Sequence, residues 1–249
     1  MIRRQKLHAL VLARKNFGEA DRVVTLFTRQ HGMLRVMAKN VRRIPSRRGA
    51  YLEPLSHVLC LVSGSQGRYF LSAVEPVDDF SALRQQSAAL RAASVITQVL
   101  LGLFEEEESQ PELFDAVHHA WSVLPQVTDA KQNILEVALL LYALERAGVG
   151  PDLTQCQICH TAQPKDAVVL HPADGGWRCL SCHDSFVGTE ASLSPRLLKA
   201  MKWLSQYPRR ALSLAMDESE SVQLATSLRR YVTYAIEAPI YVNLGTVNK

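Results

Sequence analysis

Two cysteine pairs with the same short spacing constrain this chain more than any other feature of its sequence. Two residues separate Cys156 from Cys159 and Cys179 from Cys182, and nineteen residues lie between the pairs. Two thiolates spaced in this way can bind one ion from a tight turn, and two such turns complete a tetrahedron around zinc. The pattern therefore predicts one structural Zn ion bound by all four thiolates. Accidental spacing and two disulfides are the alternatives.

Four thiolates fill the coordination of zinc, so the predicted site has no open position for water or substrate. A zinc deaminase would need a His-x-Glu motif and a proline directly before a cysteine pair. Gln155 precedes the first pair and Arg178 precedes the second, so that signature is missing. The nearby His160, His171 and His183 are interpreted as surface or loop residues rather than ligands, because the four thiols already suffice.

Composition limits the cellular setting that we expect. The 249 residues are 47% hydrophobic, which suits one large domain or two modest ones with a real core. The sequence has no run of eighteen apolar residues, so it predicts no membrane span. The apolar run at 7–13 is short, leads into Arg14 and Lys15, and lacks the small-residue cleavage site of a signal peptide. We therefore expect a cytoplasmic, reducing location, which suits metal-binding thiols. The fifth cysteine, Cys60, is expected to be a small buried residue.

Positive charge is concentrated at the start of the chain. Residues 1–68 contain fourteen Lys or Arg and three acidic residues, a net charge of +11, whereas the remainder carries −7. A basic first quarter joined to an acidic remainder suggests that the first part binds a polyanion.

Five segments near the N-terminus have the composition of β-strands. Leu34, Val36 and Ala38 alternate with more polar neighbours, which is typical of a strand with one solvated face. The predicted strands are residues 7–13, 23–28, 34–39, 55–62 and 68–74. Five short strands in about seventy residues favour a small closed barrel of the oligonucleotide-binding (OB) type. A barrel of the SH3 type is the alternative.

A cationic loop connects the third and fourth predicted strands. Residues 42–49 contain four arginines with Pro45 and Gly49, so we expect a mobile loop whose guanidinium groups suit phosphate oxygens. Nearby aromatic rings could stack on the bases of a single strand, although Phe17 and Tyr69 could equally belong to the barrel core. The candidate DNA-binding residues are Arg14, Lys15, Arg35, Lys39, Arg42, Arg43, Arg47, Arg48, Tyr51 and Arg68.

From residue 81 the apolar residues recur at helical spacing. Helices are predicted over residues 81–104, 111–124, 129–148, 195–204 and 217–237. The helix at 129–148 is apolar on most sides, so we place it at the centre of a bundle. The predicted fold is multidomain α+β, with an OB domain over 1–79 and a helical domain over 80–249. A zinc-binding module interrupts the helical domain at about 153–190.

Several short motifs resemble the N-terminal domain of the RecO family, bacterial mediators of recombination. They are residues 18–22 (GEADR), 25–28 (TLFT), 32–34 (GML), 37–39 (MAK), 46–47 (SR) and 52–54 (LEP). Residues 141–142 and 148–153, directly before the first cysteine pair, resemble the end of a helix in the same family. Asn40 stands where the family often has Gly, and it is expected to keep the turn because Asn tolerates a positive φ.

The resemblance implies a protein of DNA repair and recombination after DNA damage. It implies binding to single- and double-stranded DNA, annealing of complementary strands, and a location at the nucleoid. It also implies cooperation with RecR in loading RecA onto strands coated by single-strand-binding protein. No enzymatic activity is expected.

Two other classes of function are the alternatives. A nuclease or deaminase would need clustered carboxylates or an open zinc site, and the consecutive run Glu105 to Glu108 points in different directions around a helix. A protein-interaction scaffold with no direct role on DNA is the other alternative. A basic patch over residues 196–210, with Trp203, is a candidate surface for the acidic tail of single-strand-binding protein.

Overall fold

The computed structural model describes residues 2–43, 48–65, 68–182, 192–238 and 240. The chain divides into two compact units. One unit contains Met1–Thr97 and Phe104–Pro125, and the other contains Gln98–Leu103 and Gln126–Val242. The predicted domain boundary near residue 80 remains a prediction. No helix among the described residues is long and apolar enough to cross a membrane.

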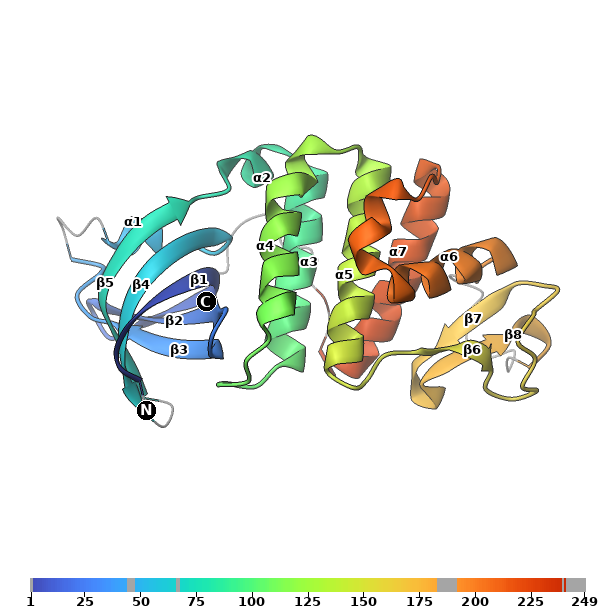
Figure 1. The fold of residues 1–249 in the computed structure, drawn as a ribbon, viewed down its shortest axis with the longest axis horizontal. Coiled ribbons are helices and arrows are strands. Elements are labelled where there is room, and N and C mark those ends of the chain that lie inside the picture. The colour runs from blue at the N-terminus through green and yellow to red at the C-terminus, as the bar shows by residue number, and fades with distance from the viewer. Residues whose placement is uncertain (1, 44–47, 66–67, 183–191, 239, 241–249) are drawn as a thin grey trace. The chain divides into compact units, whose positions relative to one another are not determined.

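The first unit is built on a closed five-stranded barrel (Figure 1). Its strands are β1 (Ile2–Phe17), β2 (Asp21–Thr28), β3 (Gly32–Ala38), β4 (Ser56–Ser65) and β5 (Arg68–Asp78). The strand order is β1-β2-β3-β5-β4, and β4 pairs with β1 to close the barrel. Among the described strand pairs of the barrel, only β3–β5 is parallel. A one-turn helix, α1 (Arg48–Tyr51), lies between β3 and β4 in the chain. This arrangement confirms the predicted OB-type barrel.

The barrel core follows the alternation visible in the sequence. On β3, Leu34, Val36 and Ala38 are buried, whereas Arg35 on the same strand is exposed. β1 is longer than predicted because it pairs with β2 along one edge and with β4 along the other. The register of β1 shifts after Val11, which lets a long strand bend around the barrel.

Cys60 belongs to this core, as predicted. Its side chain is fully buried, and burial raises the pKa of its thiol to about 12. A thiol in that state is not a nucleophile, so Cys60 acts as a small apolar residue.

The α-helices follow the predicted positions, with one break. They are α2 (Ser81–Gln85), α3 (Ser87–Leu103), α4 (Pro111–Val123), α5 (Asp129–Arg146), α6 (Pro195–Gln206) and α7 (Glu218–Ala235). The single helix predicted from residue 81 to 104 is wrong, because Gln86 adopts an extended conformation (φ −124°, ψ 115°). The Gln86 side chain instead donates a hydrogen bond to the Pro125 carbonyl, 2.8 Å away. This contact between distant residues leaves no periodic signal in the sequence.

Helix α5 lies at the centre of the second unit, as its apolar character predicted. Glu136 on α5 is fully buried and accepts two hydrogen bonds from Arg229 on α7, at 2.6 and 2.9 Å. Such a bidentate, charge-assisted pair offsets part of the cost of burying a carboxylate. The helix ends where Gly148 adopts a φ of 73°.

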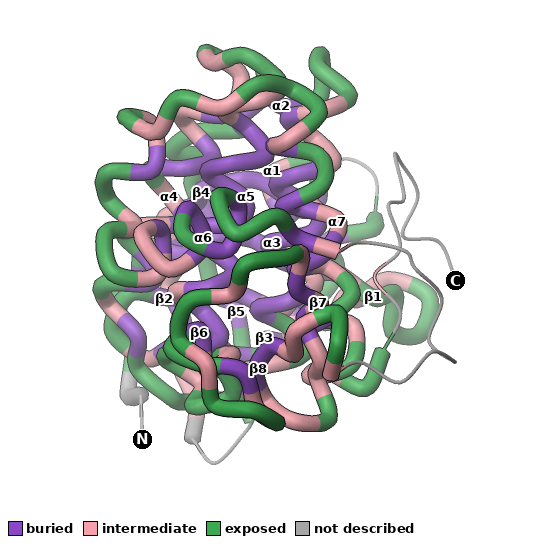
Figure 2. The backbone as a smooth tube through the Cα atoms, turned by 90° about the vertical axis from the view of Figure 1, so that its right-hand side faces the viewer, coloured by how far each residue is buried: buried purple, intermediate pink, exposed green. Residues whose placement is uncertain are grey.

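The segment between α5 and α6 contains a small sheet that the sequence patterns did not predict. Its strands are β6 (Asp152–Cys156), β7 (Val168–His171) and β8 (Gly176–Cys179), in the order β6-β8-β7. Strands of four or five residues flanked by Pro and Gly give too little alternation to be recognised. Trp177 on β8 is fully buried, and this part of β8 is purple in Figure 2.

Three histidines meet in the first unit. His8 on β1 lies 3.2 Å from His57 on β4 (Nδ1 to Nε2), and the His57 and His118 rings are 4.7 Å apart. His57 is 7% exposed. Burial, followed by the neighbouring His118 and His8, lowers the pKa of His57 to about 4, although Asp78 acts in the opposite direction. Burial also lowers the pKa of His118.

This cluster makes the barrel unit sensitive to acid. An unfolded His57 has a pKa near 6.5, so the unfolded state binds more protons as the pH falls from 6.5 towards 4. We expect the fold to lose about 3 kcal/mol over that range from His57, with the loss complete below pH 4. Amide hydrogen exchange of β1 and β4 between pH 4 and 7 measures it. His57→Gln should make the stability of the barrel less dependent on pH, whereas His160→Gln, at an exposed position, should leave the dependence unchanged. A pH dependence in His57→Gln as steep as in the wild-type protein would show that His57 is not its source.

The acidic run Glu105 to Glu108 packs along β3, within the first unit. The Glu107 amide donates to the Met33 carbonyl at 2.9 Å, and Glu106 forms a parallel bridge with Met33. Gly32 has a φ of 63°, and a Cβ placed there would lie 1.8 Å from the Glu108 carbonyl oxygen. The approach of this segment therefore requires glycine at position 32.

Gly18 offers a matched control for this contact. It has a φ of 56°, but a Cβ there would meet nothing within 4 Å. Both Gly→Ala variants incur the left-handed backbone cost of about 1–2 kcal/mol. Gly32→Ala should lose a further ~1–3 kcal/mol, because the acidic segment must move. Urea unfolding of the two variants measures the difference, and equal losses would show that the segment is not held against β3.

Candidate nucleic-acid interface and four-cysteine centre

Some of the predicted DNA-binding cations are paired within the protein. Arg14 Nη2 lies 2.7 Å from a carboxylate oxygen of Glu53, and Arg22 Nη1 lies 3.6 Å from the other oxygen. Arg35 Nε lies 3.1 Å from Glu106. The charge of Arg14 and Arg35 is thus partly neutralised, and Glu53 ties β1 to β2 instead of leaving both arginines for a ligand.

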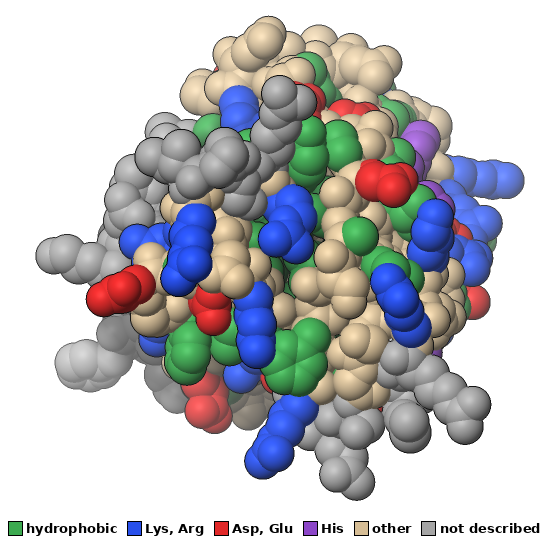
Figure 3. Space-filling view, turned by 90° about the vertical axis from the view of Figure 1, so that its left-hand side faces the viewer, with side chains coloured by type: hydrophobic (Ala, Val, Ile, Leu, Met, Phe, Trp, Pro, Cys, Tyr) green, Lys and Arg blue, Asp and Glu red, His purple; other side chains and the backbone are tan. Residues whose placement is uncertain are grey.

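Other predicted cations are free of ion pairs within the described part of the chain. Figure 3 shows many Lys and Arg side chains on the barrel face, with apolar side chains between them. The exposed cations for which the described residues provide no carboxylate partner are Lys15, Lys39, Arg42, Arg43 and Arg68. Arg48 is half-buried at the start of α1, and Arg47 lies outside the described residues.

The start of the cationic loop is held in place by hydrogen bonds. The Arg42 amide donates to the Ala20 carbonyl, and its Nη1 donates to the Gly18 carbonyl, both at 3.0 Å. Asn40 has a φ of 57°, as the resemblance led us to expect, and its amide donates to Asp21 Oδ1 at 2.7 Å. The expected mobile loop is therefore ordered up to Arg43, and residues 44–47 lie outside the described part.

Of the aromatic candidates, one is buried in the barrel core and another is partly buried against it. Tyr69 is 2% exposed in the core, and the half-buried Tyr51 packs against the same core cluster. Phe17, at the end of β1, is 57% exposed. Of these three candidates, Phe17 is the one whose ring is open to a base.

Phe70 is an exposed ring that was not among the predicted site residues. It is 44% exposed, and Lys39 Nζ lies 5.3 Å from the centre of its ring. Because residues alternate along β5, buried Tyr69 places Phe70 on the outer face with Arg68. That alternation was a signal in the sequence that could have found it. A cation beside an exposed ring suits the phosphate and the base of a single strand.

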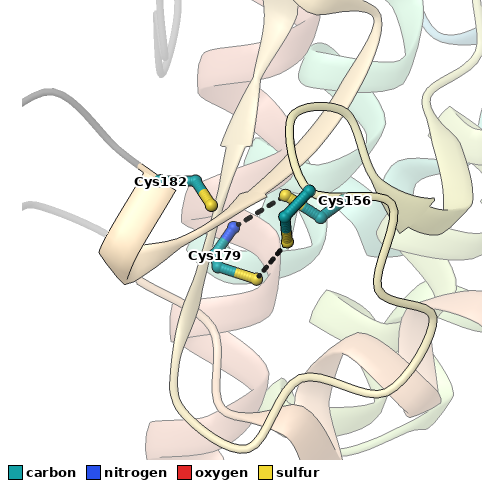
Figure 4. Close-up of side chains that lie close together, drawn as sticks. Cys156, Cys179 and Cys182 are labelled. Carbon is teal, nitrogen blue, oxygen red and sulfur yellow. Dashed lines mark hydrogen bonds between the residues drawn. The ribbon is translucent and has the colours of Figure 1, made fainter.

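The four predicted cysteine ligands come together in the second unit. Their sulfur atoms all lie within 4.8 Å of one another, and Cys159 Sγ is 3.7 Å from Cys179 Sγ. Metal–sulfur bonds of about 2.3 Å in a tetrahedron separate the sulfurs by roughly 3.8 Å. Cys156 and Cys179 end strands β6 and β8, so the sheet brings the two pairs together (Figure 4). The cluster can therefore hold a metal ion.

Backbone groups prepare one of these sulfurs for ionisation. Burial alone would raise the pKa of Cys156, but the amides of Cys159, Cys179 and Ile158 point at its sulfur and lower the pKa to about 6. The Cys179 amide lies 3.3 Å from that sulfur. Burial and the neighbouring thiols raise the pKa of Cys179. Four crowded sulfurs cannot all ionise without a cation among them, so the donor set fits a divalent metal.

The local backbone supports the first cysteine turn. His160 directly follows Cys159 with a φ of 58°, and its amide donates to the Cys156 carbonyl at 3.0 Å. His160 is exposed and lies outside the four-residue ligand cluster. His183 lies outside the described residues.

Comparison with known proteins agrees with the fold and the motifs. The family model described as "Recombination protein O N terminal" matches residues 1–80, and "Recombination protein O C terminal" matches residues 84–241. The chain is 35% identical over 176 residues to "DNA repair protein RecO" from Bifidobacterium longum strain DJO10A, covering 70% of this chain and 72% of that protein. The protein of the same name from strain NCC 2705 matches to the same extent.

The fold defines the class of this protein. It is built around an oligonucleotide-binding barrel, which helices and a four-cysteine cluster follow in the chain. Within that class, the two family matches cover nearly the whole chain. The chain belongs to the RecO family of DNA repair proteins.

The cysteine geometry predicts a metal-dependent second unit. Cys179→Ser removes the ligand that lies at the end of β8, so we expect loss of the metal ion and a lower unfolding temperature of the second unit. Elemental analysis of the purified protein measures the metal content and identifies the ion.

Cys60→Ser is the matched control, since Cys60 lies in the other unit and outside the cluster. It should leave the metal content unchanged. A Cys179→Ser protein with full metal content and unchanged stability would show that the cluster is not a metal centre.

Proposed function

We propose that this protein is a non-enzymatic mediator of recombinational DNA repair. It binds single- and double-stranded DNA through the barrel and anneals complementary strands. With RecR, it helps to load RecA onto strands coated by single-strand-binding protein. The observation that carries the proposal is the exposed Lys39–Phe70 pair on an OB-type barrel, beside cations without an internal carboxylate partner in the described part of the chain.

The barrel residues supply the two contacts that a single strand needs. Exposed cations bind phosphate oxygens without regard to sequence, and an exposed ring stacks on any base. The hydrogen bonds of Arg42 to the β1–β2 turn hold part of this surface in place before a ligand arrives. Neutralising phosphates on one strand also lowers its repulsion for a complementary strand, which favours annealing.

We further propose that the metal ion is one zinc and that its role is structural. Four sulfur ligands leave zinc no open position, so this centre would not activate water for hydrolysis. When bound, the ion supplies cross-linking between the β6 and β8 ends and a positive charge that lets all four thiols ionise. The protein then acts by binding DNA and annealing complementary strands, without turnover.

The partners follow from family membership rather than from a contact in the structure. We propose that RecR and single-strand-binding protein are protein partners, that RecA is a functional partner, and that the protein acts at the nucleoid. The predominance of acidic residues after residue 68 suits contacts with proteins more than contacts with DNA.

Binding should depend steeply on salt and on Phe70. Neutralising about five phosphates gives a log–log slope of roughly −3.5 on single strands. Replacing Lys39, Arg42, Arg43 and Arg68 with Ala should weaken binding equally across sequences and make the slope shallower by about 0.7 for each cation lost.

Phe70→Ala should cost about 1–3 kcal/mol of binding free energy, because the stacked base is lost. Fluorescence anisotropy with oligonucleotides over a salt series measures both effects.

Two substitutions serve as controls for these variants. Val77→Ala removes another exposed apolar side chain from β5, where Val77 is 50% exposed, and should leave binding unchanged. Arg14→Ala removes a cation already paired with Glu53 and should change the slope less than Arg42→Ala. A slope near zero, or equal losses in Val77→Ala and Phe70→Ala, would rule out the proposed surface.

A further inference from the structure

Helix α6 and the 3-10 helix η4 (Pro208–Ser213) carry cations in a part of the chain that is otherwise acidic. Residues 192–216 contain five Lys or Arg and no Asp or Glu, although the sequence after residue 68 has a net charge of −7. All of these residues belong to the second unit. These five cations therefore belong to a different unit and a different part of the sequence from the basic residues of the barrel.

A stripe of exposed residues runs along α6. Lys199, Trp203 and Tyr207 are spaced four apart, so they lie on one side of the helix, and Tyr207 follows its last residue. Lys199 is exposed, Trp203 is half-buried and Tyr207 is 46% exposed. Packing within the second unit explains the half-buried Trp203 but not the exposed ring of Tyr207 beside it.

The rings of this stripe are arranged with a cation beside them. The Trp203 and Tyr207 ring centres are 5.7 Å apart, at an interplanar angle of 43°. The guanidinium carbon of Arg210 lies 5.8 Å from the Tyr207 ring centre. The exposed ring and the adjacent guanidinium repeat the pairing of Lys39 with Phe70 on the barrel.

Other cations hold the stripe in position. Lys202 Nζ donates to the Thr154 carbonyl at 3.0 Å, and Arg196 forms an ion pair with Glu220. Lys131 Nζ donates to the carbonyls of Leu212 and Leu214, both at 2.7 Å, at the end of η4. Because both α6 and η4 are anchored, little ordering remains to be done when a ligand binds.

Three exposed cations do not form such anchoring contacts among the described residues. The described residues provide no ion-pair partner for Lys199, Arg209 or Arg210. Together with the two rings, they form a surface that offers stacking and phosphate contacts side by side.

We propose that this surface is a second binding site for single-stranded nucleic acid, formed by Lys199, Trp203, Tyr207, Arg209 and Arg210. An acidic peptide tail, the ligand expected for this patch from the sequence, would use the cations through its carboxylates, and it would use Tyr207 only through an aromatic residue of its own. A base uses both features. This site would bind a second strand in addition to the strand that we propose for the barrel. A single molecule could then hold two strands that are to be paired.

The full-length protein tests this site separately from the barrel. The probe is a fifteen-residue oligo-dT strand carrying 5-iododeoxyuridine, cross-linked by light and mapped by mass spectrometry. Adducts are expected on Trp203 or Tyr207 in the wild-type protein and in a barrel variant, Lys39→Glu with Phe70→Ala. In that barrel variant, Tyr207→Ala should weaken the remaining binding about tenfold, the loss of one stacked base. Tyr207→Phe should preserve it, because the ring is retained.

The controls separate a folding effect from loss of the site. Tyr234 on α7 is 59% exposed, so Tyr234→Ala removes a comparable ring from the same unit and should leave binding unchanged. An abasic strand of equal length should bind the barrel variant more weakly than oligo-dT. The proposal would be overturned if both strands bound equally and Tyr207→Ala had no effect. It would also be overturned if an oligoglutamate peptide bound more tightly than oligo-dT. Complete loss of strand binding in the barrel variant would overturn it while leaving the barrel site supported.

Discussion

The first unit depends on β1, which pairs with β2 on one edge and with β4 on the other. This double pairing closes the barrel, because no strand is left with an open edge. Closure fixes which side chains point outward. Phe70 is exposed because Tyr69, its neighbour, must fill the core. The surface that we assign to DNA is therefore a consequence of the register of the barrel.

Charge in this protein serves both structure and binding. Glu53 neutralises Arg14 and approaches Arg22, and Glu106 neutralises Arg35, so some of the fourteen basic residues among the first 68 hold the fold together. The remaining exposed cations, such as Lys39 and Arg42, are the ones available for phosphates. Counting basic residues in the sequence thus overestimates the ligand-binding charge, and the positions of a few carboxylates decide the difference.

The sequence predicts the barrel and the cysteine cluster well, because strict alternation and the Cys-x-x-Cys spacing are local signals with few structural solutions. It predicts the break at Gln86 and the sheet around Trp177 poorly, because these depend on contacts between distant residues and on very short strands. Tyr51 and Phe70 show a different limit, although alternation along β5 is a local signal for the exposure of Phe70. Their roles are decided by which face of the barrel each residue occupies, and clustering of aromatic and basic residues alone does not reveal that.

The central claim is that the barrel surface makes this protein a mediator of strand annealing. The most direct measurement is the annealing rate of complementary strands coated with single-strand-binding protein, with and without RecR, over a salt series. We predict that the wild-type protein accelerates annealing and that salt suppresses the effect. We also predict that Lys39→Glu with Phe70→Ala largely abolishes the acceleration. A barrel variant that folds normally and anneals coated strands at the wild-type rate would contradict this claim.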